Sequence, residues 1–223
     1  MPKVLLFDID GTLVDAGGAG RRAMERAFRT THRREDAVAG FVFGGMTDPA
    51  IARRALLGIG IEPTAAAMSA VLDAYLDALE DELPKAEKFR VLPDVVETLD
   101  RVQARGHTIG VGTGNLVRGA RLKLERALIH DRFAFGGYGS DHEDRAELLA
   151  RGAERGRQIH GDAKAEVVVI GDTPRDVEAA RAIGAVCVAV ATGKFTVEQL
   201  AAHAPTLVVQ TLADPAARAM LDG

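Results

Sequence analysis

Residues 4–15, VLLFDIDGTLVD, decide how the rest of the chain is interpreted. An apolar run leads directly to Asp8, Asp10 follows, and Gly11 with Thr12 turns the chain. A short apolar run bounded in this way predicts a buried strand with an acidic end. Because residues i and i+2 of an extended segment face the same side, we expect Asp8 and Asp10 to face one small volume.

Two carboxylates about 4 Å apart repel each other by roughly 4 kcal/mol at an effective dielectric constant near 20, so a fold must compensate them. Aspartate oxygens without clustered histidine or cysteine favour a hard divalent cation such as Mg²⁺. A second interpretation stays open at this point, because Asp-Gly between apolar runs is also a strong hairpin signal. Residues 7–9 and 13–14 would then be the two arms of that hairpin.

Composition limits the class of protein. With 223 residues and 47% hydrophobic content, the chain can bury a core and hold one domain plus a smaller insertion. The net charge is -4, and acidic and basic residues are interspersed, so the sequence predicts a small-molecule partner and neither nucleic acid nor membrane. The single cysteine, Cys187, lies in an apolar run and is expected to be a buried thiol. With no apolar leader and no run of membrane-spanning length, a cytoplasmic location is expected.

Residues 17–88 are predicted to be helical. A glycine-rich passage at 16–20 precedes a segment with apolar residues at helical spacing, Thr47 and Pro63-Thr64 open two further helices, and no strand is needed. This block is therefore a candidate helical domain, inserted into a core formed by residues 1–16 and 89–223.

From Pro93 onward, helical patterns alternate with short runs rich in valine and isoleucine. Such alternation predicts an α/β fold, a doubly wound parallel sheet covered on both faces. In open parallel sheets, ligands bind beyond the carboxyl ends of the strands, so polar residues that close the apolar runs become site candidates.

Three apolar runs end in such residues: Asp8 with Asp10, then Thr113, then Asp172 with Asp176 four residues later. Asp172 or Thr173 alone would be equally well explained as the cap of the helix begun by Pro174. Three polar strand ends in one chain favour a shared site.

The residue types at these ends suit phosphoryl transfer. Asp8 is the candidate nucleophile toward phosphorus, and Asp10 is the candidate acid and base that protonates the leaving alcohol and then deprotonates water. Asp172 is expected to complete a magnesium site with Asp8 and Asp10 and a main-chain carbonyl. The phosphoryl oxygens need hydrogen-bond donors. Candidates are the Thr113 hydroxyl, the backbone amides of Gly114 and Asn115, and one fixed cation.

The motifs DIDGT (8–12), Thr113, a basic residue and GDTPRD (171–176) together resemble the four motifs of the haloacid dehalogenase superfamily, and most of all its phosphoglycolate-phosphatase-like members. The resemblance implies a doubly wound core, a Mg²⁺-dependent phosphoaspartate mechanism and a mobile cap. The helical block at 17–88 lies where the first cap type of that family lies.

The resemblance also assigns the basic third motif, for which Arg145 is the candidate and Lys164 the rival. Asp176 takes a supporting role in the fourth motif. In the cap, Thr47 is a candidate substrate contact, although a plain helix cap explains it equally well.

The leading prediction is a phosphatase that acts on a small phosphorylated metabolite, with phosphoglycolate as the default by resemblance. A phosphosugar mutase of the same superfamily and a non-catalytic phosphate-binding relative are the alternatives, and both monomer and homodimer remain open. A phospho-accepting signalling receiver is disfavoured because such receivers place the phosphorylated aspartate on an internal strand and lack a helical insertion.

Overall fold

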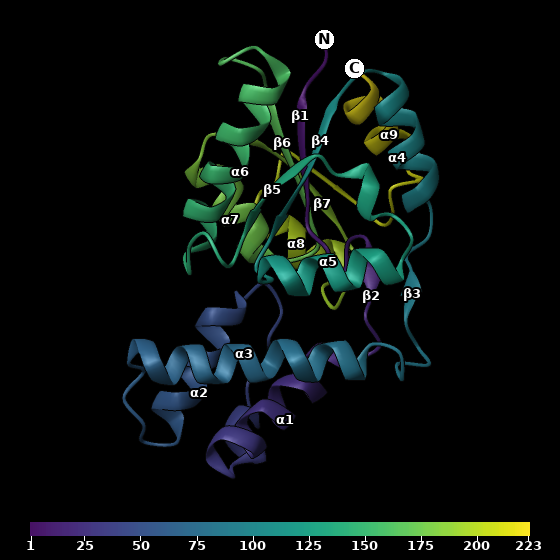
Figure 1. Ribbon diagram of the computed structural model, residues 1–223. Helices are drawn as coiled ribbons and strands as arrows, with labels where there is room; N and C mark the ends of the chain where they lie inside the picture. The colour runs from purple at the N-terminus through teal and green to yellow at the C-terminus, as the bar shows by residue number, and fades with distance from the viewer.

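Six parallel strands form the central sheet of the computed structural model, which describes residues 1–223 (Figure 1). Their order across the sheet is β5 (Phe135–Tyr138), β4 (Thr108–Thr113), β1 (Val4–Phe7), β6 (Val167–Gly171), β7 (Val186–Val190) and β8 (Leu207–Val209). In the central part of the register, Phe7 lies beside Val111 of β4 and Ile170 of β6. The residues that follow β1, β4 and β6 therefore emerge side by side at one edge.

Helices cover both faces of this sheet. One face carries α4 (Val95–Ala104), α5 (Val117–Arg126) and α9 (Pro215–Asp222), and the other carries α6 (Arg145–His160), α7 (Pro174–Ala182) and α8 (Val197–Ala201). Along β1, Leu5 and Phe7 pack into the first cluster, whereas Val4 and Leu6 pack into the second. The unbroken apolar run of β1 is needed because both of its faces are buried, and the prediction of a doubly wound parallel sheet is confirmed.

The hairpin interpretation of residues 7–14 is wrong. The chain does turn after Asp10, where Gly11 has a φ of +88° and the amide of Leu13 bonds to the carbonyl of Ile9 at 2.9 Å. However, β1 pairs in parallel with β4 and β6 rather than with the segment after the turn. That segment, β2 (Val14–Asp15), instead forms a two-stranded antiparallel ribbon with β3 (Arg90–Val91), which the sequence did not predict because each arm is only two residues long.

A separate helical layer lies beyond the carboxyl edge of the sheet (Figure 1). It consists of α1 (Ala19–His32), the 3₁₀ turn η1 (Glu35–Val38), α2 (Asp48–Gly58) and α3 (Ala65–Glu82). These elements share a hydrophobic cluster that includes Phe28, Leu56 and Tyr75. Thr47 and Thr64 cap α2 and α3 by accepting a backbone hydrogen bond at 3.2 Å each, as their positions in the sequence predict.

The remaining elements are small. A second 3₁₀ turn, η2 (His130–Arg132), precedes β5, and the terminal helix α9, capped by Asp214, was not predicted because it spans only eight residues. Cys187 is buried in β7, and burial raises the pKa of its thiol to about 12, consistent with a structural thiol. None of the helices combines the length and the apolar character needed to span a bilayer.

The packing of β1 predicts that Leu6→Ala lowers the free energy of unfolding by about 2–5 kcal/mol, because Leu6 is fully buried at the centre of the sheet. Leu57→Ala is the matched control, since Leu57 is 56% exposed and a surface change of this kind is worth about 0.5 kcal/mol or less. Urea unfolding of both variants measures the difference, and equal losses would contradict the assigned burial.

Candidate active site

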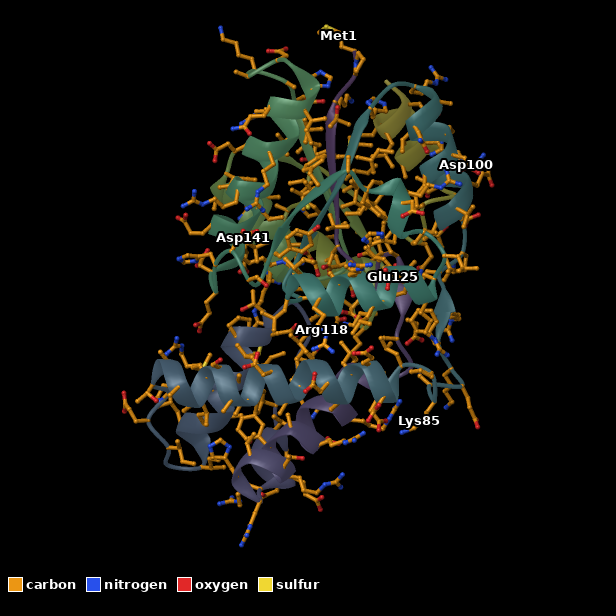
Figure 2. All side chains as sticks on the ribbon, viewed as in Figure 1. Met1, Lys85, Asp100, Arg118, Glu125 and Asp141 are labelled. Atoms are coloured by element: carbon orange, nitrogen blue, oxygen red, sulfur yellow. The ribbon has the colours of Figure 1, made fainter.

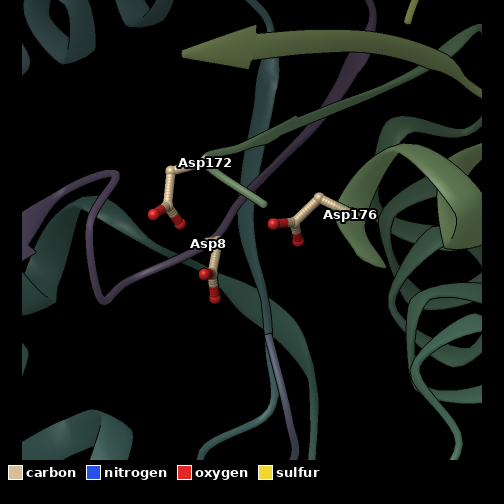
Figure 3. A group of neighbouring side chains, drawn as sticks. All are labelled: Asp8, Asp172 and Asp176. Atoms are coloured by element: carbon tan, nitrogen blue, oxygen red, sulfur yellow. The ribbon is translucent and has the colours of Figure 1, made fainter. Parts of the chain in front are cut away.

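Three aspartates converge at the carboxyl edge of the sheet (Figure 3). Asp8 follows β1, Asp172 follows β6, and Asp176 lies in the first turn of α7. One carboxylate oxygen from each lies within 4.8 Å of the others, and all three residues are buried. The register of β1 against β6 brings Asp8 and Asp172 together although they are far apart in the chain.

Asp176 has a full set of hydrogen bonds. Its Oδ2 accepts from the Thr173 amide at 3.0 Å and from the Thr173 hydroxyl at 2.7 Å, and its Oδ1 accepts from Arg145 Nε at 2.8 Å. The predicted helix cap therefore exists, but Thr173 and Asp176 form it and Asp172 does not. Asp172 is different, because its Oδ1 is buried without any hydrogen-bond partner.

Arg145 supplies the fixed cation. It opens α6, is buried, and places Nη2 3.1 Å from Asp8 Oδ1 and 2.5 Å from Asp176 Oδ1. Its guanidinium is therefore fixed between two carboxylates, with its positive charge beside the Asp8 oxygen. The rival Lys164 is exposed in the turn before β6, so the structure brings Arg145 and not Lys164 to the aspartates.

The electrostatics of the cluster favour a bound cation. Burial, above all, raises the pKa of Asp8 to about 6 against the lowering effect of Arg145, and burial followed by the charge of Asp176 raises the pKa of Asp172 well above its usual value. One guanidinium does not balance three buried carboxylates. The unpartnered oxygen of Asp172 beside Asp8 fits a hard divalent ion, which Asp8 and Asp172 would hold.

Backbone on two sides holds Asp172 in place. A Cβ added to Gly193 would lie 1.7 Å from Asp172 Oδ2, and one added to Gly11 would lie 2.3 Å from the same atom. The Thr192 hydroxyl donates to the carbonyl of Gly11 at 2.6 Å and so ties the two loops together. Thr192 and Gly193 were not predicted as site residues, although their position at the end of the apolar run of β7 was a usable signal.

The Asp10 side chain takes a different direction from that of Asp8. Its Oδ2 lies 2.5 Å from Lys123 Nζ and accepts from Asn115 Nδ2 at 2.9 Å, and its carboxylate is outside the cluster of three. The expectation that both side chains face one metal ion is corrected, because the chain bends at Ile9 and the i, i+2 rule applies only to an extended segment. Asp10 therefore retains only its main-chain carbonyl as a candidate metal ligand.

The loop after β4 has two functions. Thr113 is fully buried, and its hydroxyl oxygen accepts from Asn115 Nδ2 at 2.8 Å, which leaves the hydroxyl proton free to donate. Asn115 connects Thr113, Asp10 and Lys123 through its side-chain amide. Gly114 directs its carbonyl to the amide of Asp48 in the helical layer at 2.8 Å.

The helical layer is docked against this loop. A Cβ on Gly114 would lie 2.6 Å from the carbonyl oxygen of Met46, so the two backbones touch. Asp48 Oδ2 accepts from the amide of Leu116, the N-cap residue of α5, at 2.9 Å. Thr47 does not line the cavity described below; its hydroxyl donates to the carbonyl of Glu143 at 2.9 Å, so the predicted substrate contact is corrected to a capping and docking contact.

A cavity of about 520 Å³ lies between the sheet edge and the helical layer. Aspartates 8, 10 and 172, together with Thr113 and Arg145, line its floor. Residues of the helical layer and the β7 loop line its other walls, including Arg21, Phe43, Tyr75, Lys194 and Phe195. The predicted site residues Gly114 and Asn115 also line it. The volume suits a small metabolite.

The fold and the site together define a family. Residues 2–184 match the family model of haloacid dehalogenase-like hydrolases, so the chain belongs to that family. This finding confirms the resemblance inferred from the four motifs and the expectation of a hydrolase.

Individual relatives agree with this assignment. The chain is 29% identical to a phosphoglycolate phosphatase of Pseudomonas aeruginosa over 96% of its own length and 78% of that protein. Its fold is similar to the crystal structure of CbbY from Rhodobacter sphaeroides in complex with phosphate, with a TM-score of 0.76, 16% identity and full coverage of both chains. It is also similar to a putative β-phosphoglucomutase from Bacteroides vulgatus, with a TM-score of 0.69 and 22% identity over 99% of this chain and 88% of that one.

The tight packing around Asp172 predicts that Gly193→Ala displaces its carboxylate and removes Mg²⁺ binding. The wild-type melting temperature is expected to rise by several degrees at saturating Mg²⁺, since ligand at 100 times its Kd adds about 2.7 kcal/mol. Gly193→Ala is expected to lose this rise. The control is Gly58→Ala, where a Cβ meets nothing within 4 Å, and an unchanged Mg²⁺ response in Gly193→Ala would contradict the assignment.

The buried Asp48 predicts a specific pH dependence of stability. Burial raises its pKa from 3.8 to about 6, although Lys123 opposes the shift; the Leu116 amide and Tyr75 also lower the pKa and Asp10 raises it. Between about pH 4 and 6, the folded state therefore holds a proton on Asp48 that the unfolded chain has already released. The stability that comes from protonated Asp48 is present at low pH and is lost as the pH rises through about 6.

Asp48→Asn removes this titration. Relative to the wild type, its free energy of unfolding is expected to increase by about 2–3 kcal/mol between pH 4 and pH 7, as two pKa units imply. Denaturant unfolding of both proteins across this range measures the difference, in which the other titrating groups cancel. A difference that stays constant with pH would show that Asp48 does not titrate in this range.

Proposed function

We propose that this chain is a magnesium-dependent phosphatase that hydrolyses a small phosphorylated metabolite through a phosphoaspartate on Asp8. The observation that supports this most strongly is the arrangement of one nucleophile candidate between a cation and a metal site. Asp8 lies 3.1 Å from Arg145 Nη2 and within 4.8 Å of the unpartnered carboxylate of Asp172.

In the first step, a carboxylate oxygen of Asp8 forms a bond to phosphorus as the ester P–O bond breaks. The leaving oxygen takes a proton from Asp10, and the free alcohol departs. In the second step, Asp10 accepts a proton from water as that water attacks the phosphoaspartate, which releases inorganic phosphate and restores Asp8.

Other residues stabilise the charge on the phosphoryl oxygens. Arg145 holds its positive charge beside Asp8, and the Thr113 hydroxyl, already oriented by Asn115, has its proton free to donate in the same cavity. A bound Mg²⁺ would supply further positive charge at these oxygens, held by Asp8 and Asp172. Asp176 acts on the site by orienting Arg145 rather than by contacting substrate.

The walls of the cavity favour a substrate with a second anionic group. Lys194 faces the cavity without an ion-pair partner. Arg21 also lines the cavity, stacked 4.1 Å from the Phe43 ring centroid, anchored to the carbonyls of Val38 and Phe41 and 3.9 Å from the surface carboxylate of Glu25. The neighbouring Arg22 is paired with Glu82 at 3.0 Å and does not line the cavity. A short phosphorylated carboxylic acid such as phosphoglycolate fits this charge distribution, and the relatives carry the same activity in their names.

The helices of residues 17–88 are proposed to act as a cap over the site. They contribute the upper wall of the cavity and meet the core through close backbone contacts at Gly114 and at Gly45, where a Cβ would lie 2.6 Å from the Thr173 hydroxyl. These contacts define a closed arrangement, which limits the access of bulk water to the site. Substrate entry requires these contacts to separate.

The proposal predicts Mg²⁺-dependent turnover of p-nitrophenyl phosphate and faster turnover of phosphoglycolate. Asp8→Asn is expected to abolish both activities, and Arg145→Ala to lower kcat by about 10²-fold or more through the loss of charge stabilisation. Arg121→Met on the surface of α5 serves as the control. Release of inorganic phosphate measures hydrolysis; transfer of the phosphoryl group to a sugar would indicate a mutase instead, and absence of any turnover would indicate a phosphate-binding relative.

A further inference from the structure

Lys123 is a buried cation that the reaction described above does not use. It lies on α5, is only 3% exposed, and places Nζ 2.5 Å from Asp10 Oδ2 and 2.6 Å from Asn115 Oδ1. Asn115 in turn donates to the same Asp10 oxygen at 2.9 Å. Asp10, Lys123 and Asn115 therefore form a closed ring of hydrogen bonds.

This ring fixes the Asp10 carboxylate although the residue itself is partly open. The Asp10 side chain is 43% exposed, and an exposed carboxylate ordinarily samples several rotamers. Two donors on Oδ2 hold it in one orientation and leave Oδ1 as the oxygen available for proton transfer. A proton donor needs this order, because its efficiency depends on a donor–acceptor distance within about 3 Å.

The cap completes the surroundings of Lys123. A Cβ added to Gly20 of α1 would lie 3.9 Å from Lys123 Nζ and 3.8 Å from the Tyr75 hydroxyl of α3, so these groups gather around one point. The buried carboxylate of Asp48 on α2 adds a charge interaction with Lys123. In Figure 1, α5 is the core helix that faces α3 across the junction, and a Cβ added to Gly119 of α5 would lie in ordinary van der Waals contact with Leu79 of α3, at 3.4 Å.

Surface contacts along α5 mark the same junction. Arg118 lies between α5 and α3 in Figure 2 and donates to Asp77 at 2.8 Å. It is 46% exposed, so this ion pair is worth little. Lys123 is different because its ammonium is removed from water, and a buried charge is tolerated only when it is well paired. Its pairing with Asp10 inside the cavity indicates a function beyond docking of the cap.

We propose that Lys123 is a positioning residue that orients the Asp10 carboxylate for proton transfer to the leaving group. The inference rests on the proposed phosphatase reaction. As the ester P–O bond breaks, the proton on Asp10 Oδ1 moves to the leaving oxygen, and the carboxylate that remains is already bonded to the Lys123 ammonium. The cost of reorienting charge during this step is therefore low.

The test compares two leaving groups. p-Nitrophenolate departs from p-nitrophenyl phosphate without a proton, whereas the alcohol of phosphoglycolate needs one. The parameter kcat/KM is compared because it covers only the steps up to departure of the leaving group and excludes the shared hydrolysis of the phosphoaspartate. Lys123→Met keeps most of the apolar stem and removes the ammonium.

Lys123→Met is expected to lower kcat/KM for phosphoglycolate by about 10²-fold or more, the usual contribution of a positioned acid, and that for p-nitrophenyl phosphate by less than about tenfold. Asn115→Ala removes the other donor to Asp10. Like Lys123→Met, it is expected to lower kcat/KM for phosphoglycolate more than kcat/KM for p-nitrophenyl phosphate. Arg121→Met, a surface change on the same helix, is expected to leave both values unchanged.

A double-mutant cycle separates positioning from direct substrate binding. In an Asp10→Asn background, Lys123→Met is expected to lower kcat/KM for phosphoglycolate little further, because both changes remove the same proton-transfer step. Equal losses for the two substrates, or additive losses in the cycle, would overturn the inference. If the wild type hydrolyses neither substrate, the proposed function fails instead, so the two failures are distinguishable.

Discussion

The mutual repulsion of Asp8, Asp172 and Asp176 is the constraint on which the site depends. Three buried carboxylates within 4.8 Å of one another are unstable without positive charge, and burial raises the pKa of Asp8 and Asp172 accordingly. Arg145 compensates part of this charge from the first turn of α6. The remaining negative charge favours a divalent cation, so the repulsion among the carboxylates and their affinity for a metal have the same origin.

The doubly wound sheet makes this concentration of charge possible. Strands β1 and β6 are held in register by residues buried on both faces, so Asp8 and Asp172 are fixed by a large hydrophobic core rather than by their own contacts. Gly11 and Gly193 then bring backbone against the Asp172 carboxylate more closely than any side chain would allow. The rigid strands and loops thus hold the carboxylates close together although their charges repel each other.

The sequence was sufficient to predict the sheet, the helical insertion and the strand-end residues Asp8, Thr113 and Asp172. Apolar runs indicate buried strands, and the polar residues that follow those runs indicate the carboxyl edge of the sheet. It was insufficient for Asp10, where one bend at Ile9 redirects the side chain. It also missed Lys123, because the periodicity of α5 shows which face of the helix is buried but not where the end of a long side chain goes. The burial of Asp48 could not be predicted either, because it depends on docking against Leu116, a contact between distant segments.

The two carboxylates proposed to be catalytic, Asp8 and Asp10, therefore differ through their surroundings and not through their type. Asp8 is buried against Arg145 and beside Asp172, which suits an oxygen that attacks phosphorus next to a metal ion. Asp10, two residues later, is partly exposed to the cavity and is held by Lys123 and Asn115, which suits proton transfer to and from a substrate oxygen. Separate environments for neighbouring carboxylates are a general way to assign nucleophilic and acid–base roles to identical groups. The bend at Ile9, where the alternation of an extended strand ends, separates the two side chains, and it places Asp10 on the side of the cavity where the cap helices meet the core.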